Sequence, residues 1–466
     1  MTQFNNPRSL NSLQAMASRG SVASMMDWEV SDMPEAPASP ETLKEAGLSL
    51  TMLNEMVLRT LLIRGTMLGL DLSRVLCLPF RVIEESLYFL KDEKCIEVTG
   101  GDLIGQVSYR FALTDLGRQR AREAYKLCSY IGPAPVPIED YVEQAYRQAV
   151  TGIHCTPEIL RISFTHLVLP DELFMAIGPA VVSGKSIFIY GPPGNGKTAI
   201  ATAIGDFMNR SGGSIYVPYA FHADGGIVTV YDPTLHQLAE DPANERLDDN
   251  EATIRRLLNT NTVDARWLRI RRPVVITGGE LNLEMLDLRY NAEANFYQAP
   301  LHVKANGGVF LIDDFGRQLV SPKELLNRWI LPLESRHDYL TMATGKKIEV
   351  PFEQLIIFST NLDPKDLVDD AFLRRIRHKV GIEAPQRDVY SRIFEMNCKR
   401  LGMNMSTEAI DYLYDRYYNR GRSPRASDCR DLLEIVQAIC RYRKQPVRLT
   451  PQLIAEAATQ FIAEFK

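Results

Sequence analysis

Hydrophobic positions between residues 48 and 130 repeat first at helical spacing and then at strand spacing. Three segments with apolar residues on one helical face come before two alternating segments, and a last helix begins at Thr114 or Asp115. The helical segments are 49–65, 70–78 and 81–94, and the alternating segments are 95–101 and 106–114. The pattern predicts a small α+β module of three helices, a hairpin and a closing helix.

This order of elements resembles a winged helix-turn-helix, and LTDLGRQRARE (113–123) is similar to the end of the wing in many such domains. A helix that enters the major groove normally presents a basic or polar face to the phosphates. The third helix instead carries an excess of acid: its charged residues are Glu84, Glu85, Asp92 and Glu93 against Arg81, Lys91 and Lys94. Protein docking or oligomer contact is therefore favoured, while Arg118, Arg120 and Arg122 on the closing helix keep DNA binding open.

Proline and small polar residues mark the segments on either side of this module. Residues 1–40 are polar and end in three closely spaced prolines, which predicts a flexible tail or a docking segment. Residues 132–150 begin with GPAPVP and are expected to form a proline-stiffened linker. The module is therefore expected to span residues 41–131.

A strand, a glycine-rich loop and a helix follow one another from Ser186 onward. The loop matches GxxxxGK[ST], whose glycines let backbone N–H groups turn toward phosphates at the positive end of the helix. Lys197 is expected to neutralise the β- and γ-phosphates of ATP, and Thr198 is expected to bind Mg²⁺. The predicted nucleotide-binding residues of the loop are Gly191, Pro192, Pro193, Gly194, Asn195, Gly196, Lys197, Thr198 and Ala199.

A second apolar strand, at residues 309–312, ends in two acidic residues. A carboxylate at the carboxyl end of a strand beside a P-loop lies where Mg²⁺ must be held. Asp313 is therefore predicted to bind Mg²⁺ together with Thr198.

With these two motifs in place, the next features resemble those of AAA+ ATPases. The apolar strand before Asn361 is similar to the sensor-1 strand, whose polar tip positions the water. In DDAFLRRIRHKV (369–380), Arg375 matches best the arginine that reaches the γ-phosphate of a neighbouring subunit; the next matches are Arg374 and then Arg377. Arg425, which opens a helix after RSP, matches the sensor-2 arginine of the lid.

The resemblance covers about residues 150–466. It implies an α/β fold: a P-loop AAA+ core with a parallel sheet between helices (151–382), followed by an α-helical lid (383–466). It also implies ATP and Mg²⁺ as cofactors and a homo-oligomeric ring, with a hexamer as the family default. Most relatives carry, at the position of Asp314, the glutamate that activates the attacking water. The resemblance therefore implies that Asp314 is this base, and its shorter side chain predicts slower hydrolysis; Glu280, in the sequence ITGGE, is the alternative base.

A further pattern narrows the resemblance. KANGGVFLIDDFGR (304–317) and ELLNRWILPLE (324–334) resemble enhancer-dependent sigma-factor activators and MoxR-type ATPases. Between them and Asn361, two alternating segments turn at Thr344–Gly345, which predicts a hairpin. A hairpin here marks the branch that contains MoxR proteins, magnesium chelatase subunits, those activators and branch-migration motors, in which it often faces the pore of the ring.

The stretch from about 214 to 300 is longer than the minimal fold needs between its two motifs, and we interpret it as an insert. Its aromatic residues Tyr290, Phe296 and Tyr297 are expected either to grip a substrate or, the favoured interpretation, to pack the insert's own core. His222 and His236 lack a third ligand and are expected to be structural.

Composition and charge indicate the class of protein and its cellular compartment. Hydrophobic residues make up 45% and charged residues 24% of the chain, which is ordinary for a soluble protein. A net charge of -5 and a pI near 5.9 argue against a general electrostatic grip on nucleic acid. The seven scattered cysteines indicate a reducing compartment, and the sequence contains neither a bilayer-spanning run nor a secretory signal. A cytoplasmic protein without membrane association is expected.

Three functions remain open. The favoured one is an ATPase that remodels a protein partner, with the N-terminal module as its adaptor. The second is a DNA-directed motor or transcription regulator whose winged helix binds DNA. The third is a scaffold that assembles on ATP and turns it over slowly, as the short side chain of Asp314 suggests.

Overall fold

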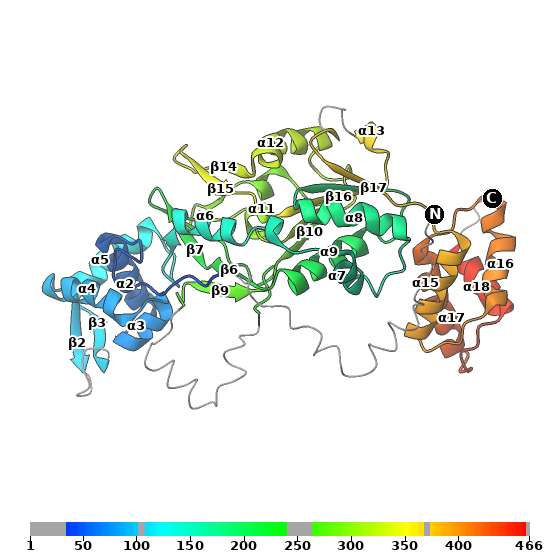
Figure 1. Ribbon diagram of the computed structural model, residues 1–466. Helices are drawn as coiled ribbons and strands as arrows, with labels where there is room; N and C mark the ends of the chain where they lie inside the picture. Colours follow the sequence, from blue (N-terminus) through cyan, green and yellow to red (C-terminus); the bar gives the residue numbers. More distant parts are fainter. Residues whose placement is uncertain (1–33, 101–107, 240–262, 368–372, 463–466) are drawn as a thin grey trace, which may run out of the picture.

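The computed structural model describes residues 34–100, 108–239, 263–367 and 373–462. Three regions lie in a row, in chain order: an N-terminal module, a central α/β core and a helical lid (Figure 1). In this described part of the chain, every helix is too short or too polar to cross a bilayer.

The central core is a five-stranded parallel sheet with the order β10-β13-β16-β5-β17. The strands are β10 (Val274–Thr277), β13 (Val309–Ile312), β16 (Leu355–Thr360), β5 (Ser186–Tyr190) and β17 (His378–Gly381). Every residue of β13 and β16 is buried, because helices cover both faces of the sheet. This confirms the predicted α/β fold class.

Each face of the sheet has its own hydrophobic core. One face packs against α7 (Pro157–Ser163), α8 (Asp171–Ser183) and α9 (Lys197–Ser211), with Phe164, Ile177 and Ile200 fully or almost fully buried. The other face packs against α12 (Pro322–Ser335), where Trp329 lies among Phe310, Phe352 and Phe358. α11 (Leu301–Lys304) adds Ala305, just past its end, to this second core.

The lid is helical, as predicted, and has a hydrophobic core of its own around Tyr390, Leu433 and Ile454. Its helices are α15 (Arg387–Arg400), α16 (Thr407–Arg416), α17 (Ala426–Tyr442) and α18 (Pro451–Phe461). α16 and α18 both begin at a capping residue, since the Ser406 and Thr450 side chains accept backbone N–H bonds of the first turn.

The N-terminal module has the predicted elements in the predicted order. They are α2 (Leu50–Arg64), α3 (Gly69–Leu76), α4 (Phe80–Asp92), β2 (Ile96–Gly100), β3 (Arg110–Leu113) and α5 (Asp115–Leu127). Thr114 is the N-cap of the closing helix and accepts a bond from the Gly117 N–H. A two-residue strand, β1 (Met67–Leu68), pairs with β3 and widens the hairpin into a three-stranded sheet. The sequence pattern did not predict this strand.

The segment expected to be a linker belongs to a layer between the module and the core. Its residues form β4 (Val136–Pro137) and α6 (Ile138–Arg147), and Tyr141 of α6 stacks on Phe221 at 5.1 Å between ring centroids. β4 is the edge strand of a second sheet, where proline is tolerated. The order of that sheet is β11-β12-β8-β7-β4, with β11 (Arg289–Asn291), β12 (Phe296–Gln298), β8 (Gly226–Thr229) and β7 (Ala220–Ala223).

The predicted insert is not one continuous addition. β10, an edge strand of the core sheet, lies inside the expected range 214–300 and divides it into two pieces. The first piece also contains β6 (Ile215–Pro218) and β9 (Trp267–Ile270), which pair with each other. Of the predicted tail, residues 1–33 lie outside the described residues, whereas the Pro37 carbonyl accepts the Asp264 N–H at 2.8 Å.

Candidate nucleotide-binding site

Parallel strands place their carboxyl ends at one edge of a sheet, which is where α/β folds bind ligands. β5 leads into the P-loop, β13 ends before Asp313 and β16 ends before Asn361. Since β16 lies between β5 and β13, Asn361 follows the strand that separates the P-loop from the acidic pair. The strand order thus brings together three site segments that are far apart in the sequence.

Two glycines of the P-loop are required by the fold. Gly194 and Gly196 have φ values of +83° and +82°, in the left-handed region that favours glycine. Gly196 caps α9, whose first turn directs its backbone N–H groups toward the loop. Lys197 donates from Nζ to the carbonyls of Gly191 and Pro192 at 3.0 and 3.1 Å. Burial lowers the pKa of this lysine, while Asp313 and Asp314 act to raise it.

Thr198 and Asp313 meet, as predicted for a shared Mg²⁺. The Thr198 hydroxyl donates to Asp313 Oδ2 at 2.6 Å, although the two residues are 115 positions apart. Hydroxyl and carboxylate oxygens are the ligands that Mg²⁺ prefers beside nucleotide phosphates. The residues present therefore fit a Mg²⁺ ion held by Thr198 and Asp313.

The backbone conformation of Asp314 gives a reason for its short side chain. Its φ is +48°, a left-handed conformation that aspartate and asparagine adopt more readily than longer side chains. Its N–H donates to Asp313 Oδ1 at 3.0 Å, and the next residue, Phe315, donates its N–H to the Ser359 carbonyl at 2.6 Å. The turn is thereby fixed to β16, with the Asp314 side chain exposed.

Glu280, the alternative base, follows β10, the strand beside β13. Its carboxylate accepts the Gly278 N–H at 2.9 Å, and this bond lowers the pKa of Glu280. Both candidate bases therefore lie at the carboxyl edge of neighbouring strands.

Asn361 has an unsatisfied side chain. Its Oδ1 atom is buried and has no hydrogen-bond partner within the described residues. Leaving a buried acceptor without a partner costs about 1–3 kcal/mol. A water molecule that donates to this oxygen would remove the cost, as expected of a sensor-1 residue.

The lid touches the P-loop at the start of α17. The Ser427 N–H donates to the Gly194 carbonyl at 2.8 Å, and the Ala426 N–H donates to Asn195 Oδ1 at 3.1 Å. Arg425 is the exposed N-cap residue of α17, so the predicted sensor-2 arginine is adjacent to these contacts. No local pattern indicated that Asn195 joins the loop to the lid, because its partner lies 231 positions away.

The three candidate trans arginines lie just before β17, and Arg377, which is exposed, is adjacent to its first residue. Arg375 Nε donates to Glu334 Oε1 at 2.7 Å, near the end of α12. Arg374 is exposed.

The predicted hairpin is present as β14 (His337–Thr341) and β15 (Lys347–Pro351), with Gly345 at φ +83° in its turn. Arg328 of α12 attaches the hairpin to that helix, because it donates to both carboxylate oxygens of Asp338 in β14, at 2.6 and 2.8 Å.

The aromatic residues of the insert pack against neighbouring elements and do not form a loop that projects into solvent. Tyr297 is 5% exposed within the core that joins the second sheet to the hairpin, and its hydroxyl accepts the Ala343 N–H. Phe296 packs against the N-terminal module, with its ring 5.7 Å from that of Tyr130. Tyr290 is 42% exposed and lies against Tyr297. This favours packing over the substrate-gripping loop.

The two histidines considered for metal binding contact the backbone. His222 Nε2 lies 2.9 Å from the Gly47 carbonyl, and His236 Nε2 lies 2.8 Å from that of Lys304. Burial lowers the pKa of both rings. Within the described residues, no group of three histidine, cysteine or acidic side chains could hold a metal ion.

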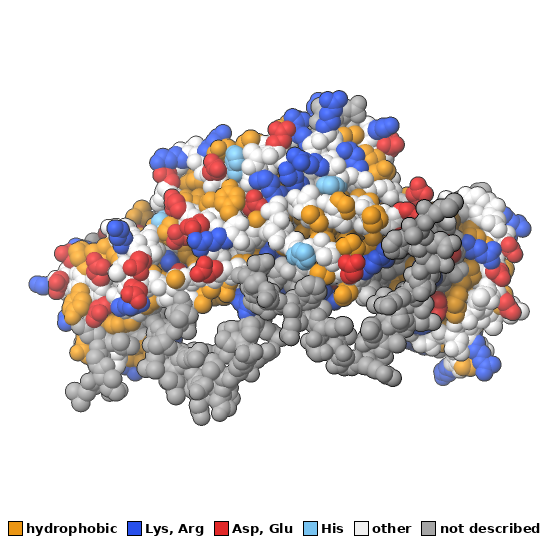
Figure 2. Space-filling view, in the orientation of Figure 1, with side chains coloured by type: hydrophobic (Ala, Val, Ile, Leu, Met, Phe, Trp, Pro, Cys, Tyr) orange, Lys and Arg blue, Asp and Glu red, His pale blue; other side chains and the backbone are white. Residues whose placement is uncertain are grey.

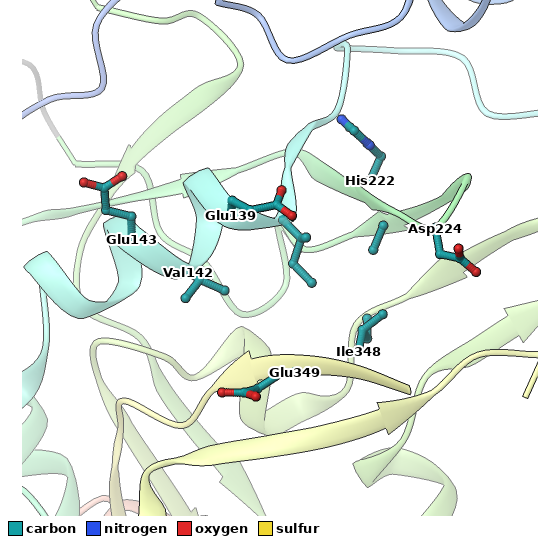
Figure 3. A pocket seen from close by; sticks show the side chains of 9 residues that line it. Glu139, Val142, Glu143, His222, Asp224, Ile348 and Glu349 are labelled. Atoms are coloured by element: carbon teal, nitrogen blue, oxygen red, sulfur yellow. The ribbon is translucent and has the colours of Figure 1, made fainter. Parts of the chain in front are cut away.

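An open cavity of about 620 Å³ lies beside the hairpin, between α6, the β7–β8 turn and β15 (Figure 3). Apolar side chains of Val142 and Ile348 line it together with several carboxylates. Asp224 pairs with Lys346, and Glu143 pairs with Arg147. No P-loop residue lines this cavity, so it is separate from the nucleotide site.

Comparisons with known proteins give a partial match and weak structural likenesses. The family described as a domain of unknown function (DUF8689) matches residues 386–460, which are the lid. No curated protein matches the sequence.

Similar solved structures include two forms of RuvB and domain III of the replication initiation protein DnaA, all from Thermotoga maritima. One form of RuvB, a single-residue variant, is 11% identical, with a TM-score of 0.34, and the match covers 62% of this chain and 66% of that one. RuvB described as a Holliday junction branch migration motor is 14% identical, with coverages of 65% and 69% and a TM-score of 0.33. DnaA domain III is 13% identical, with coverages of 66% and 99% and a TM-score of 0.34. At scores this low, function must be inferred from the site residues themselves.

Proposed function

We propose that this chain is an AAA+ ATPase that binds Mg-ATP at the P-loop and hydrolyses it as a homo-oligomer. The observation that carries the proposal is the 2.6 Å hydrogen bond between Thr198, in the first turn of α9 after the P-loop, and Asp313. Asn361 follows β16, the strand between the two strands that lead to these residues. A chance glycine-rich loop would not bring with it an acidic strand and an unsatisfied polar atom at the same edge of the sheet.

In the proposed reaction, water attacks the γ-phosphate of ATP, and ADP and phosphate leave. Lys197 neutralises charge on the phosphates, and Thr198 and Asp313 hold Mg²⁺, which screens charge on the same groups when bound. Asn361 orients the attacking water. Asp314 accepts its proton, with Glu280 as the alternative acceptor.

Two further arginines complete the proposed site. Arg425 reaches the phosphates from the lid of the same chain. Arg375, or else Arg374, reaches them from a neighbouring subunit, where an arginine can raise the rate about 10³-fold or more. The hairpin before Asn361 supports placement in the MoxR-like branch, and a ring, with a hexamer as the default, follows from that placement.

A protein is the proposed partner, docked on the N-terminal winged-helix-like module. Acidic side chains gather over this module on the face shown in Figure 2. Two of the three arginines that favoured DNA are paired within the module, Arg118 with Asp115 and Arg120 with Glu93. On α4, Tyr88 and Phe89 are 50% and 43% exposed, as suits a protein contact better than a phosphate backbone.

The test compares ATP hydrolysis by the full chain with that of Lys197→Ala, Asp314→Asn and Glu280→Gln, at several protein concentrations. We expect a rate per subunit that rises with concentration and is lost in Lys197→Ala. The base is the acidic residue whose substitution abolishes turnover while ATP binding stays intact. An unchanged rate in Lys197→Ala would refute the proposal.

The same preparation distinguishes the alternatives. A salt-dependent shift of double-stranded DNA by the full chain would favour the DNA-directed motor. Assembly on ATP with negligible turnover would favour the scaffold. Capture of a specific protein by the ATP-bound Asp314→Asn variant would favour remodelling.

A further inference from the structure

A basic turn joins α17 to α18 in the lid. This basic turn consists of residues 441–448 (RYRKQPVR), all of which are exposed and none of which is acidic. Figure 2 shows Lys and Arg side chains at this lower end of the lid. Arg443 donates to Glu456 at 3.0 Å. Within the described part of the chain, no carboxylate pairs with the other three cations, which are Arg441, Lys444 and Arg448.

The adjoining helices account for part of this charge. The partial negative charge at the end of a helix stabilises cations in its last turn, and Arg441 and Arg443 benefit in this way at the end of α17. Arg448 does not, because it lies two residues before Thr450, the N-cap of α18, where the helix carries partial positive charge. Helix stabilisation therefore leaves Arg448 unexplained.

Lys444 occupies a backbone position that favours glycine. Its φ is +56°, and its N–H donates to the Arg441 carbonyl at 2.9–3.1 Å, as in the last turn of other helices here. Gly402 makes the same turn after α15, with φ +67° and a bond to the Lys399 carbonyl. A side chain with a Cβ is strained in this conformation, so the lysine carries a cost to folding that glycine would avoid.

Tyr442 gives the basic turn an exposed aromatic ring. Its side chain is 89% exposed, the highest value among the bulky hydrophobic side chains that the structure describes. Its neighbours in the sequence are both arginines. An exposed ring beside several cations provides a flat surface on which a planar group can stack.

We propose that the basic turn binds single-stranded nucleic acid: Tyr442 stacks on a base, and the three cations without a carboxylate partner contact phosphates of the backbone. Proteins that bind single strands without sequence preference combine cations along the backbone with aromatic side chains on which bases stack. In a duplex the bases are stacked on one another, so the ring has no base face to contact. An acidic peptide would use the cations and leave the ring exposed. An anionic bilayer would need a wider apolar surface than Pro446 and Val447 add.

The basic turn is separate from the nucleotide site. α17 contacts the P-loop at Ser427, and Tyr442 lies about 22 Å further along the same helix. The inference therefore goes beyond the proposed function, because nucleic acid can bind at the turn whether or not ATP is hydrolysed.

The experiment titrates a labelled oligothymidylate of about 20 nucleotides with the full chain and follows its fluorescence anisotropy at several salt concentrations. Tyr442→Ala should weaken binding about five- to 150-fold, because the stacked base loses its partner. Tyr442→Phe keeps an aromatic ring and should bind as wild type does. Lys444→Gly and Arg448→Gln should each make the dependence of log affinity on log salt shallower by about 0.7 for every turn engaged, since each removes one phosphate contact.

The matched control is Lys94→Gly in the N-terminal module. Lys94 is also exposed and has a φ of +55° just after α4, so this variant removes the same charge from the same backbone conformation. Both glycine variants should stay folded, because glycine suits this conformation. Lys94→Gly should leave the affinity and its salt dependence unchanged.

Four results would overturn the proposal. They are no binding of oligothymidylate by wild type, unchanged affinity in Tyr442→Ala, an equal loss in Lys444→Gly and Lys94→Gly, and tighter binding of a competitor. The competitors are the duplex of oligothymidylate with oligoadenylate, polyglutamate, and phosphatidylserine vesicles, which offer negative charge without an unstacked base. ATP hydrolysis that depends on Lys197 would stand in each case, because none of these measurements requires turnover.

Discussion

Gly194 is the point at which the P-loop meets the lid, and Gly194→Ala tests that contact. Its φ is +83°, and a side chain with a Cβ costs about 1–2 kcal/mol in that conformation. An added Cβ would also lie 2.5 Å from Ser427 Oγ and 3.4 Å from Ser427 Cβ. The hydroxyl must therefore turn away, whereas the Ser427 Cβ is at an ordinary contact distance.

The expected result is weaker ATP binding. If the loop relaxes when empty and must regain its conformation on binding, a strain of about 1–2 kcal/mol weakens binding about five- to thirtyfold. The contact with Ser427 increases the loss further. Adding Ser427→Ala removes the 2.5 Å contact and should return the affinity to the range set by backbone strain alone. Calorimetric titration with Mg-ATP measures both variants.

A second glycine provides the control. Gly345, in the hairpin turn, also has φ +83°, but an added Cβ would meet no atom within 4 Å. Gly345→Ala should thus lower the free energy of unfolding by about 1–2 kcal/mol and leave ATP binding unchanged. Wild-type affinity in Gly194→Ala, or no recovery with Ser427→Ala, would refute the reasoning.

Three further predictions concern stability, measured by denaturant unfolding. Asp264→Asn leaves Arg266 buried without its carboxylate and should cost about 3–5 kcal/mol, whereas Asp71→Asn in the exposed pair with Arg74 should stay within about 0.5 kcal/mol. Tyr297→Ala should cost about 3–5 kcal/mol and the more exposed Tyr290→Ala much less, and equal losses would contradict the packing role of Tyr297. Burial lowers the pKa of His302, so between its folded value and about 6.5 the unfolded chain binds a proton that the folded chain does not. Stability should accordingly fall as the pH drops through and below about 6.5, and His302→Gln should reduce this slope.

Local patterns were enough to predict the candidate site. The P-loop, Asp313 and Asn361 each follow an apolar strand, and the edge at which such strands end is common to parallel sheets. The sequence pattern did not predict β10, which has only four residues. Its place in the sheet depends on pairing with β13, whose residues lie 35 positions later in the sequence. The proline-rich segment was interpreted as a linker because proline disrupts central strands, but β4 is an edge strand, where proline is tolerated. The ion pair of Arg375 with Glu334 depends on how α12 packs, which no local pattern encodes.

The second sheet changes how the N-terminal module can act. Ala220 and Ile227 of this sheet are buried in the hydrophobic core of the module, and Phe296 packs against it. Arg266, 2% exposed, pairs with Asp264 and also donates to the Ala46 carbonyl within the module. Contacts of this kind fix a module in place, whereas a flexible linker would leave it free to move. The segment between the P-loop and the acidic strand therefore attaches the N-terminal module to the core. A partner docked on α4 would be held at a fixed position relative to the nucleotide site.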